Sequence, residues 1–169
     1  MPATQERLPV RLLIVCLGNI CRSPMAEGVL RARIEASPLA GQVILDSVGT
    51  GNWHAGEPPD PRAIATAARH GVDISGLRAR QLSREDYTSH HWLLCADRNN
   101  LRDVRARGSS EAHSRCALLL DWAGVGDADV PDPYTGGDAE FEAVWAMLDR
   151  AAHGVVERLE NELRARESA

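Results

Sequence analysis

The sequence predicts a single α/β domain in which a four-stranded parallel sheet is flanked by helices on both faces. Four short apolar runs, at residues 10–15, 43–48, 91–96 and 116–120, are separated by segments with helical periodicity. Such alternation is typical of a parallel sheet covered on both faces. With 169 residues the chain can also bury a substantial core. We expect a disordered lead-in over residues 1–9, one domain over residues 10–163 and a tail over residues 164–169.

The helical segments carry recognisable start and stop signals. Ser23 and Pro24 are suited to be the cap and first residue of a helix that ends near residue 34. An alanine-rich helix over residues 61–70 stops at Gly71, and Asp97 is suited to cap a basic helix that runs to residue 107. The clearest stripe lies in the last helix, at Phe141, Val144, Trp145, Leu148, Ala152, Val155, Val156 and Leu159.

Composition narrows the classes of function and the compartment. A net charge of −5 argues against a general surface for nucleic acid or anionic membranes, and no apolar run approaches transmembrane length. The four cysteines do not resemble a disulfide framework for a secreted domain. We therefore expect a cytoplasmic protein, a monomer by default, that binds neither nucleic acid nor membrane.

The segment CLGNICRSP, residues 16–24, joins the first apolar run to the first helix. Gly18 and Asn19 permit a tight loop, and the helix start supplies N–H groups and positive potential for an anion. Arg22 can hold a phosphate-like group through two parallel hydrogen bonds, and Ser23 can donate to the sulfur of Cys16. A small buried Cys16 and a surface Arg22 are the alternative, which the surrounding residues disfavour. The pattern predicts phosphate transfer with Cys16 as nucleophile.

A displacement at phosphorus also needs an acid for the leaving oxygen, and Asp132 is the best candidate. It lies between Pro131 and Pro133, which restrict its backbone, in a glycine-containing loop. Because Asp-Pro is common in plain turns, the residues alone leave the acid and the turn interpretations open.

The motifs CLGNICRSP, SVGTGNWH, RHGVDISGLRARQL, LLCADRNNL and PDPY occur in this order. Together they closely resemble the low-molecular-weight protein tyrosine phosphatases, over residues 10–159. The resemblance implies a four-stranded parallel sheet, no metal and no cofactor, and a tyrosine-phosphorylated protein as substrate. It also implies a phosphocysteine intermediate, with Cys16 as nucleophile, Arg22 as phosphate clamp and Asp132 as general acid.

The resemblance further proposes supporting roles. Asn19 resembles the residue that holds the loop in a strained conformation, with Ser47 and His70 bonding to it. Ser47 could instead satisfy a turn, and His70 could be favoured at its helix end by the dipole. Asp97 is first a helix cap and second a residue that braces the loop.

Walls around the loop should select the substrate. Leu17, Ile20, Trp53 and Tyr134 resemble the family positions that line a deep slot for a flat ring. In the related protein-arginine phosphatases, the position between the loop asparagine and the next cysteine resembles a threonine position. Ile20 occupies that position in this chain, and an isoleucine there favours phosphotyrosine. His54 is assigned no role. The remaining substrate-binding residues that the resemblance implies are Gly18, Asn19, Cys21 and Ser23.

The cysteines and tyrosines bear on regulation and on rival functions. Cys21 is expected to form a reversible disulfide with Cys16 under peroxide. Tyr134 is followed by Thr135, whereas many family members carry two adjacent tyrosines, so regulation through a second tyrosine is not expected. An arsenate reductase would need extra thiols on a mobile segment, but Cys95 and Cys116 lie in apolar runs. A non-catalytic phosphotyrosine-binding module would be expected to lack the nucleophile or the acid. A protein-arginine phosphatase remains the third alternative.

Overall fold

A computed structural model describes residues 9–168. Its sheet contains four parallel strands in the order β2-β1-β3-β4. Strand β1 is central, and Leu12 lies in register with Leu45 on one side and with Trp92 on the other. The predicted fold class is confirmed. The strands are β1 (Val10–Cys16), β2 (Val43–Gly49), β3 (Trp92–Cys95) and β4 (Cys116–Leu118).

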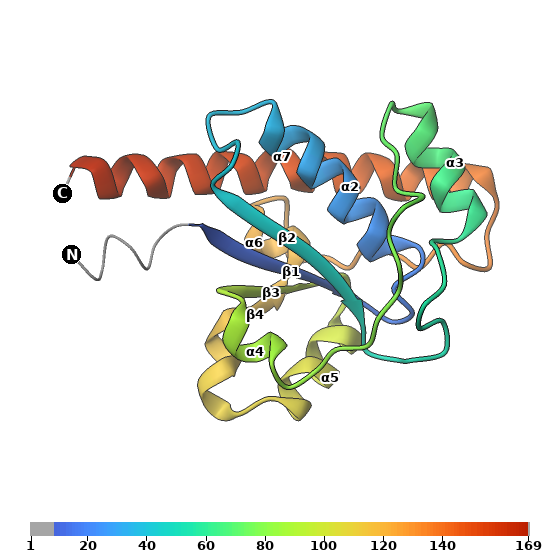
Figure 1. Ribbon diagram of the computed structural model, residues 1–169, viewed down its shortest axis with the longest axis horizontal. Helices are drawn as coiled ribbons and strands as arrows, with labels where there is room; N and C mark the ends of the chain where they lie inside the picture. Colours follow the sequence, from blue (N-terminus) through green and yellow to red (C-terminus); the bar gives the residue numbers. More distant parts are fainter. Residues whose placement is uncertain (1–8, 169) are drawn as a thin grey trace.

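Helices cover both faces of the sheet (Figure 1). Alternate side chains of β1 enter two separate cores: Leu12 and Ile14 enter one, and Leu13 and Val15 enter the other. The first core lies under α2 (Arg22–Glu35), α3 (Pro61–Arg69), α6 (Leu119–Trp122) and α7 (Asp138–Ser168). The second lies on the side of α4 (Asp86–Ser89), α5 (Arg98–Arg107) and the 3₁₀ helix η1 (Ser110–Arg115).

The long helix α7 packs the apolar stripe predicted from the sequence against α2 and α3. It continues to Ser168, five residues beyond the expected end at residue 163. Ion pairs spaced one turn apart extend toward that end, including Arg158 with Glu162 at 3.1 Å. Residues 1–8 of the expected lead-in over residues 1–9, and the last residue of the expected tail, lie outside the described residues.

The predicted cap of α5, Asp97, is confirmed, and Asp60 caps α3 in the same way. The Asp60 side chain accepts a hydrogen bond from the Arg62 N–H at 2.8 Å, and Asp97 accepts one from the Asn100 N–H at 2.8 Å. Gly71, just past the end of α3, has a φ of 78° as expected for a helix stop.

Two local predictions were wrong. Helix α2 begins at Arg22, with Cys21 as its cap residue, so Ser23 already lies in the first turn and does not cap it. Pro24 is tolerated there because the N–H groups in the first turn of a helix have no partner within the helix, so a residue without an N–H loses no hydrogen bond. The fourth apolar run is a strand only to Leu118 and turns into α6 at Leu119. A short apolar run cannot by itself distinguish a strand from a buried helical turn.

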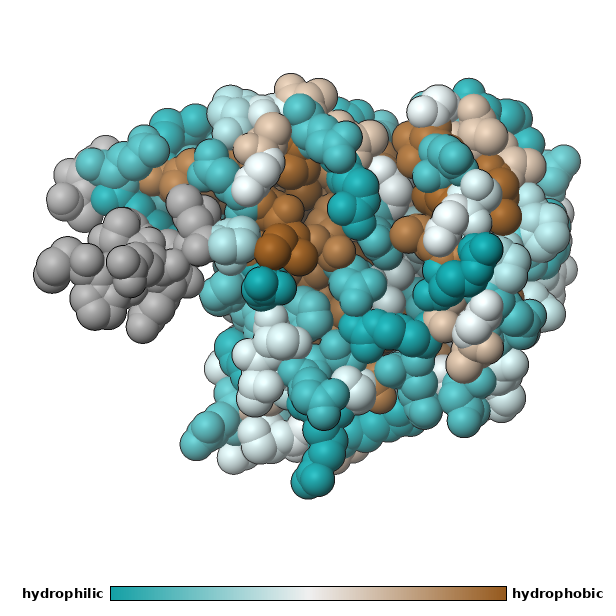
Figure 2. Space-filling view, viewed as in Figure 1, coloured by the Kyte–Doolittle hydropathy of each residue, from teal (hydrophilic) through white to brown (hydrophobic). Residues whose placement is uncertain are grey.

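The face of the molecule shown in Figure 2 is mainly polar. Figure 2 shows hydrophilic residues over most of the visible face, with hydrophobic residues gathered over β2 and around α3. Ile44 of β2 is 38% exposed. Within residues 9–168, no helix is both long and apolar enough to cross a membrane.

Close packing of α7 on the end of α6 leads to a stability prediction. A Cβ at Gly154 would lie 2.0 Å from the carbonyl oxygen of Ala123. Gly154→Ala should therefore lower the free energy of unfolding by about 1–3 kcal/mol, despite the better helix propensity of alanine. Urea denaturation measures the change. His153→Ala, at an exposed neighbouring position, should leave stability nearly unchanged, and a more stable Gly154→Ala protein would contradict this packing.

Candidate active site

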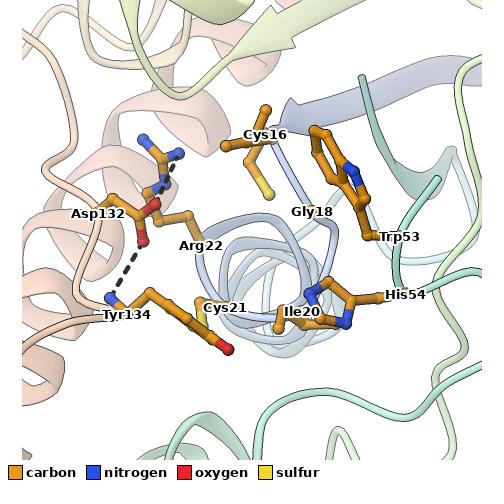
Figure 3. Close-up of a pocket in the computed structure, with 10 residues that line it drawn as sticks. Cys16, Gly18, Ile20, Cys21, Arg22, Trp53, His54, Asp132 and Tyr134 are labelled. Carbon is orange, nitrogen blue, oxygen red and sulfur yellow. Dashed lines mark hydrogen bonds and ion pairs between the residues drawn. The ribbon is translucent and has the colours of Figure 1, made fainter. Parts of the chain in front are cut away.

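A cavity of about 170 Å³ lies at the carboxyl end of β1 (Figure 3). Strand β1 lies between β2 and β3, so the chain moves to opposite sides of it, and parallel sheets bind ligands at such a reversal in strand order. The cavity is lined by residues from three parts of the chain: Cys16, Leu17, Gly18, Ile20, Cys21, Arg22, Trp53, His54, Asp132 and Tyr134.

The loop of residues 16–22 is held in place by hydrogen bonds from neighbouring segments to its carbonyl groups. The carbonyls of Cys16 and Leu17 accept hydrogen bonds from the N–H groups of Thr50 and Gly51, each at 2.9 Å. The carbonyl of Ile20 accepts one from the Asp60 N–H at 2.8 Å. These carbonyls are thus bound to neighbouring segments, while the N-terminus of α2 meets the cavity at Arg22. The arrangement is suited to an anion.

The sulfur of Cys16 receives two polar contacts. The Asn19 N–H donates to Sγ at 3.3 Å, and the Ser23 Oγ lies 3.0 Å from Sγ. The same Oγ accepts a hydrogen bond from Asn19 Nδ2 at 2.7 Å, so its own hydrogen is free to point at the sulfur. Both contacts place polar hydrogens where they can stabilise negative charge that develops on the sulfur.

Asn19 is the centre of the network behind the loop. Its φ is 59°, and among the described residues it is the one non-glycine residue with a positive φ. Asn19 Nδ2 also donates to Ser47 Oγ at 3.0 Å, and Asn19 Oδ1 accepts from the Arg80 N–H at 3.0 Å. Ser47 in turn donates to the buried Glu27 at 2.8 Å. These bonds keep the left-handed conformation that an asparagine tolerates better than most residues.

His70 is not part of this network, contrary to the expectation that it bonds to Asn19. Its Nε2 lies 2.8 Å from Oε2 of Glu142, and its ring stacks on Trp145 with centroids 5.0 Å apart. Both partners belong to α7, which packs beside the end of α3 where His70 lies. The histidine therefore joins two helices, and the Arg80 N–H occupies the Asn19 oxygen.

Arg22 is 3% exposed and is held at its far end. Its Nη1 donates to Asp97 Oδ2 at 2.6 Å and to the carbonyl of Val130 at 2.9 Å. Asp97 thus caps α5 through one oxygen and holds Arg22 through the other. Burial opposes the charge on Arg22, but Cys16, Asp97 and Asp132 outweigh burial and raise the pKa of Arg22 above its ordinary value.

Asp132 lies beside Arg22 at the edge of the cavity, across from Trp53 and His54 (Figure 3). Its Oδ2 lies 3.7 Å from Nη2 of Arg22, and its Oδ1 accepts a hydrogen bond from the Tyr134 N–H at 3.1 Å. The side chain is 45% exposed, so a proton can pass between it and solvent. The structure thus brings together the three residues from which catalysis was predicted, although Arg22 and Asp132 lie far apart in the sequence.

The mouth of the cavity is apolar and exposed. Leu17, Trp53 and Tyr134 are 41%, 67% and 48% exposed, which is unusual for large hydrophobic side chains. Ile20 lines the cavity deeper in, at 8% exposed. His54, to which the sequence assigned no role, lines it too, and its ring lies 3.2 Å from where a Cβ on Gly18 would be.

Two residues expected to bind substrate lie elsewhere. Asn19 and Ser23 are buried behind the loop and do not line the cavity; their polar groups face the sulfur and the network. Glu27 and Arg80, which support that network, were missed because nothing in their local sequence marks them as partners of residue 19 or 47.

All four cysteines are free and buried. Cys21 lines the cavity with Cys16, and burial, followed by nearby Asp60, raises the pKa of its thiol well above the usual range. Cys95 and Cys116 lie in the second core, on paired strands. Across residues 9–168, no group of three or more histidine, cysteine or acidic side chains is placed to hold a metal ion.

Comparison with known proteins gives a consistent result. The family model described as low molecular weight phosphotyrosine protein phosphatase matches residues 11–165. The chain is 39% identical to a low molecular weight protein-tyrosine-phosphatase of Streptomyces coelicolor, over 92% of this chain and 97% of that protein. It is 34% identical to the low molecular weight phosphotyrosine protein phosphatase of Sus scrofa, over 91% of this chain and 98% of that protein. A crystal structure of a protein tyrosine phosphatase from Entamoeba histolytica superposes with a TM-score of 0.86 at 30% sequence identity. The match covers 90% of this chain and 98% of that one.

The tight approach of β2 to the loop gives a prediction. A Cβ at Gly49 would lie 2.7 Å from the carbonyl oxygen of Leu17 and 3.1 Å from the nitrogen of Asn19. Gly49→Ala should displace the loop backbone and weaken binding of inorganic phosphate by about tenfold or more, since one lost charge-assisted hydrogen bond is worth roughly 1.5–3 kcal/mol. Calorimetric titration measures the affinity.

Gly76→Ala is the matched control for this variant, because nothing lies within 4 Å of the added methyl group there. It should bind phosphate as the unaltered protein does. Unchanged phosphate affinity in a folded Gly49→Ala protein would contradict the inferred role of the loop backbone.

Proposed function

Because the chain belongs to the low molecular weight phosphotyrosine protein phosphatase family, we propose that Cys16, Arg22 and Asp132 carry its reaction. The enzyme hydrolyses phosphotyrosine in proteins through a phosphocysteine intermediate, as its family does. The observation that supports these assignments best is the pair of donors, from Asn19 and Ser23, on the sulfur of Cys16. The same cavity holds a guanidinium and a carboxyl group.

In the first step the Cys16 thiolate attacks phosphorus, and the bond from phosphorus to the tyrosine oxygen breaks. Arg22 and the loop N–H groups hold the equatorial oxygens, whose negative charge develops further in the transition state. The carboxylic acid of Asp132 gives its proton to the leaving oxygen, so that a neutral phenol departs. Asp97 and the Val130 carbonyl support this role of Arg22 by fixing Nη1.

In the second step the Asp132 carboxylate takes a proton from water, and the oxygen of that water attacks phosphorus. The bond from phosphorus to sulfur breaks, inorganic phosphate leaves, and the thiolate is restored. Ser23 supports both steps. Its hydroxyl stabilises the Cys16 thiolate as the nucleophile in the first step and as the leaving group in the second step. Asn19, with Ser47, keeps that hydroxyl oriented.

The walls of the cavity favour a flat aromatic ring. Trp53 and Tyr134 stand at its mouth and Ile20 lies within, so a phenyl phosphate can place its ring among apolar surfaces while its phosphate reaches the loop. Isoleucine at position 20 supports phosphotyrosine over phosphoarginine, which presents a charged guanidinium. An arsenate reductase is not favoured, since Cys95 and Cys116 are 0% and 2% exposed. A binding module without catalysis is not favoured either, because a nucleophile and an acid line one cavity.

We also propose a monomeric enzyme in the cytoplasm. A reducing compartment suits a thiol nucleophile, and the four free cysteines are consistent with it. Because one chain supplies the proposed nucleophile, phosphate clamp and acid, a monomer is sufficient for the reaction.

The decisive test is steady-state hydrolysis of phosphotyrosine, phosphoserine and phosphoarginine peptides by the unaltered protein and by Cys16→Ser. The unaltered protein should prefer phosphotyrosine. In Cys16→Ser, kcat should fall by about 10³ or more, because an alcohol at this position is far less ionised than a thiol. The variant should still bind inorganic phosphate through Arg22 and the loop, which serves as the control for folding. Turnover by Cys16→Ser near the original rate would refute the covalent route.

Cys21 gives a separate prediction about oxidation. Peroxide converts the Cys16 thiolate to a sulfenic acid; the Cys21 sulfur then attacks that sulfur, a disulfide forms and water leaves. Dithiothreitol should therefore restore activity to the peroxide-treated protein but not to Cys21→Ser, whose Cys16 proceeds to irreversible acids. Cys116→Ala, which removes a thiol from the other core, should recover as the unaltered protein does. Full recovery of Cys21→Ser would exclude the disulfide.

A further inference from the structure

Arg62, in the first turn of α3, connects two segments that are far apart in the sequence. Its Nη2 donates to the carbonyl of Tyr134 and its Nη1 to the carbonyl of Gly136, each at 2.9 Å. Its Nε and Nη2 also donate to the two carboxylate oxygens of Asp60, each at 3.0 Å. One side chain thus holds the backbone of the segment that carries Asp132.

The guanidinium of Arg62 is also confined by rings. It lies 4.6 Å from the ring centroid of Phe141, which is fully buried, and 5.6 Å from that of Tyr134. Stacking of this kind fixes the plane of the guanidinium, so the direction of its N–H groups is set before substrate arrives. A lysine has neither the plane nor enough fixed donors to reproduce these contacts.

The other end of this connection is the loop of the nucleophile. The Asp60 N–H donates to the carbonyl of Ile20 at 2.8 Å, while the Asp60 carboxylate holds Arg62 and caps α3. A continuous path of hydrogen bonds therefore runs from the 16–22 loop through Asp60 and Arg62 to residues 134 and 136.

We propose that Arg62 is a positioning residue that sets the distance between the Asp132 carboxyl group and the oxygen leaving phosphorus. This inference rests on the proposed role of Asp132 as general acid. Asp132 lies two residues before Tyr134, and its Oδ1 accepts from the Tyr134 N–H, so a shift of the Tyr134 backbone moves the carboxyl group. Gly136 and Gly137 give this segment freedom to move unless its carbonyls are held.

A series of aryl phosphates with increasingly basic leaving groups, from 4-nitrophenyl to phenyl phosphate, tests the proposal. The ratio kcat/KM reports the steps up to departure of the phenol, before water enters the reaction. A weakly basic phenolate leaves without a proton, whereas phenol itself needs one. Misplacing Asp132 therefore lowers kcat/KM more for phenyl phosphate than for 4-nitrophenyl phosphate, and a general loss of structure lowers both alike.

In Arg62→Ala, kcat/KM should fall by about tenfold or more for phenyl phosphate and by about threefold or less for 4-nitrophenyl phosphate, within the range of acid catalysis. Arg62→Lys should likewise lower kcat/KM more for phenyl phosphate than for 4-nitrophenyl phosphate. Arg69→Ala is the matched control: it removes an arginine from the same helix whose Nε pairs with Glu142 at 2.7 Å, and it should leave the series unchanged. Thermal melting checks that each variant is folded.

Asp132→Ala separates failure of this inference from failure of the proposed function. A steep dependence on the leaving group in Asp132→Ala, with a uniform or absent loss in both Arg62 variants, overturns the role of Arg62 alone. A flat dependence in Asp132→Ala overturns the general acid and the inference with it. If the Arg62 variants are unfolded, Asp60→Asn keeps the helix cap but weakens the hold on Arg62, and must show the same selective loss.

Discussion

A thiolate at the buried end of a strand is stable only if donors replace the water that it loses, and the left-handed turn at Asn19 supplies them. With a φ of 59°, this residue turns its N–H toward the Cys16 sulfur while its amide group points behind the loop to Ser23 and Ser47. Both amide hydrogens and the amide oxygen are used, so the conformation is held from several sides. The strain of a positive φ is compensated by bonds that fix the direction of the Ser23 hydroxyl.

Charge balance then determines what the cavity binds. The Arg22 guanidinium lies between carboxyl groups on both sides, Asp97 at 2.6 Å and Asp132 at 3.7 Å, and burial makes both interactions stronger than in water. Asp97 is committed to holding the arginine, since its other oxygen caps α5. Asp132 is more exposed and less tightly bound, so it can exchange this contact for one to substrate when a phosphate dianion takes its place beside Arg22.

The sequence is informative wherever the chemistry is local. The spacing from Cys16 to Ser23 lies within one strand, one turn and one helix start, so a short motif was enough to predict the loop and to propose Cys16 as its nucleophile. The alternation of apolar runs likewise predicted the sheet. Position 70 shows the limit: its neighbours are consistent with either a dipole-stabilised histidine or a partner of Asn19. Only the packing of α7, which presents Glu142 and Trp145, decides between the two. Arg62 was missed for the same reason, because both carbonyls it holds lie over 70 residues away.

The proposed nucleophile and the proposed acid consequently depend on different parts of the fold. The 16–22 loop is built by β1, the start of α2 and the end of β2, which pair directly. The segment with Asp132 is attached by contacts of individual side chains and backbone groups. The Val130 N–H donates to the Ala96 carbonyl at 2.8 Å, the Val130 carbonyl accepts from Arg22, Asp129 pairs with Arg98, and the carbonyls of Tyr134 and Gly136 accept from Arg62. Proton transfer requires a closer fit than phosphate binding, because hydrogen bonds weaken steeply with angle and distance. The helix packing that orients Arg62 therefore acts most directly on the position of the proposed acid, and it reaches the loop around the sulfur only through Asp60, whose N–H holds the Ile20 carbonyl.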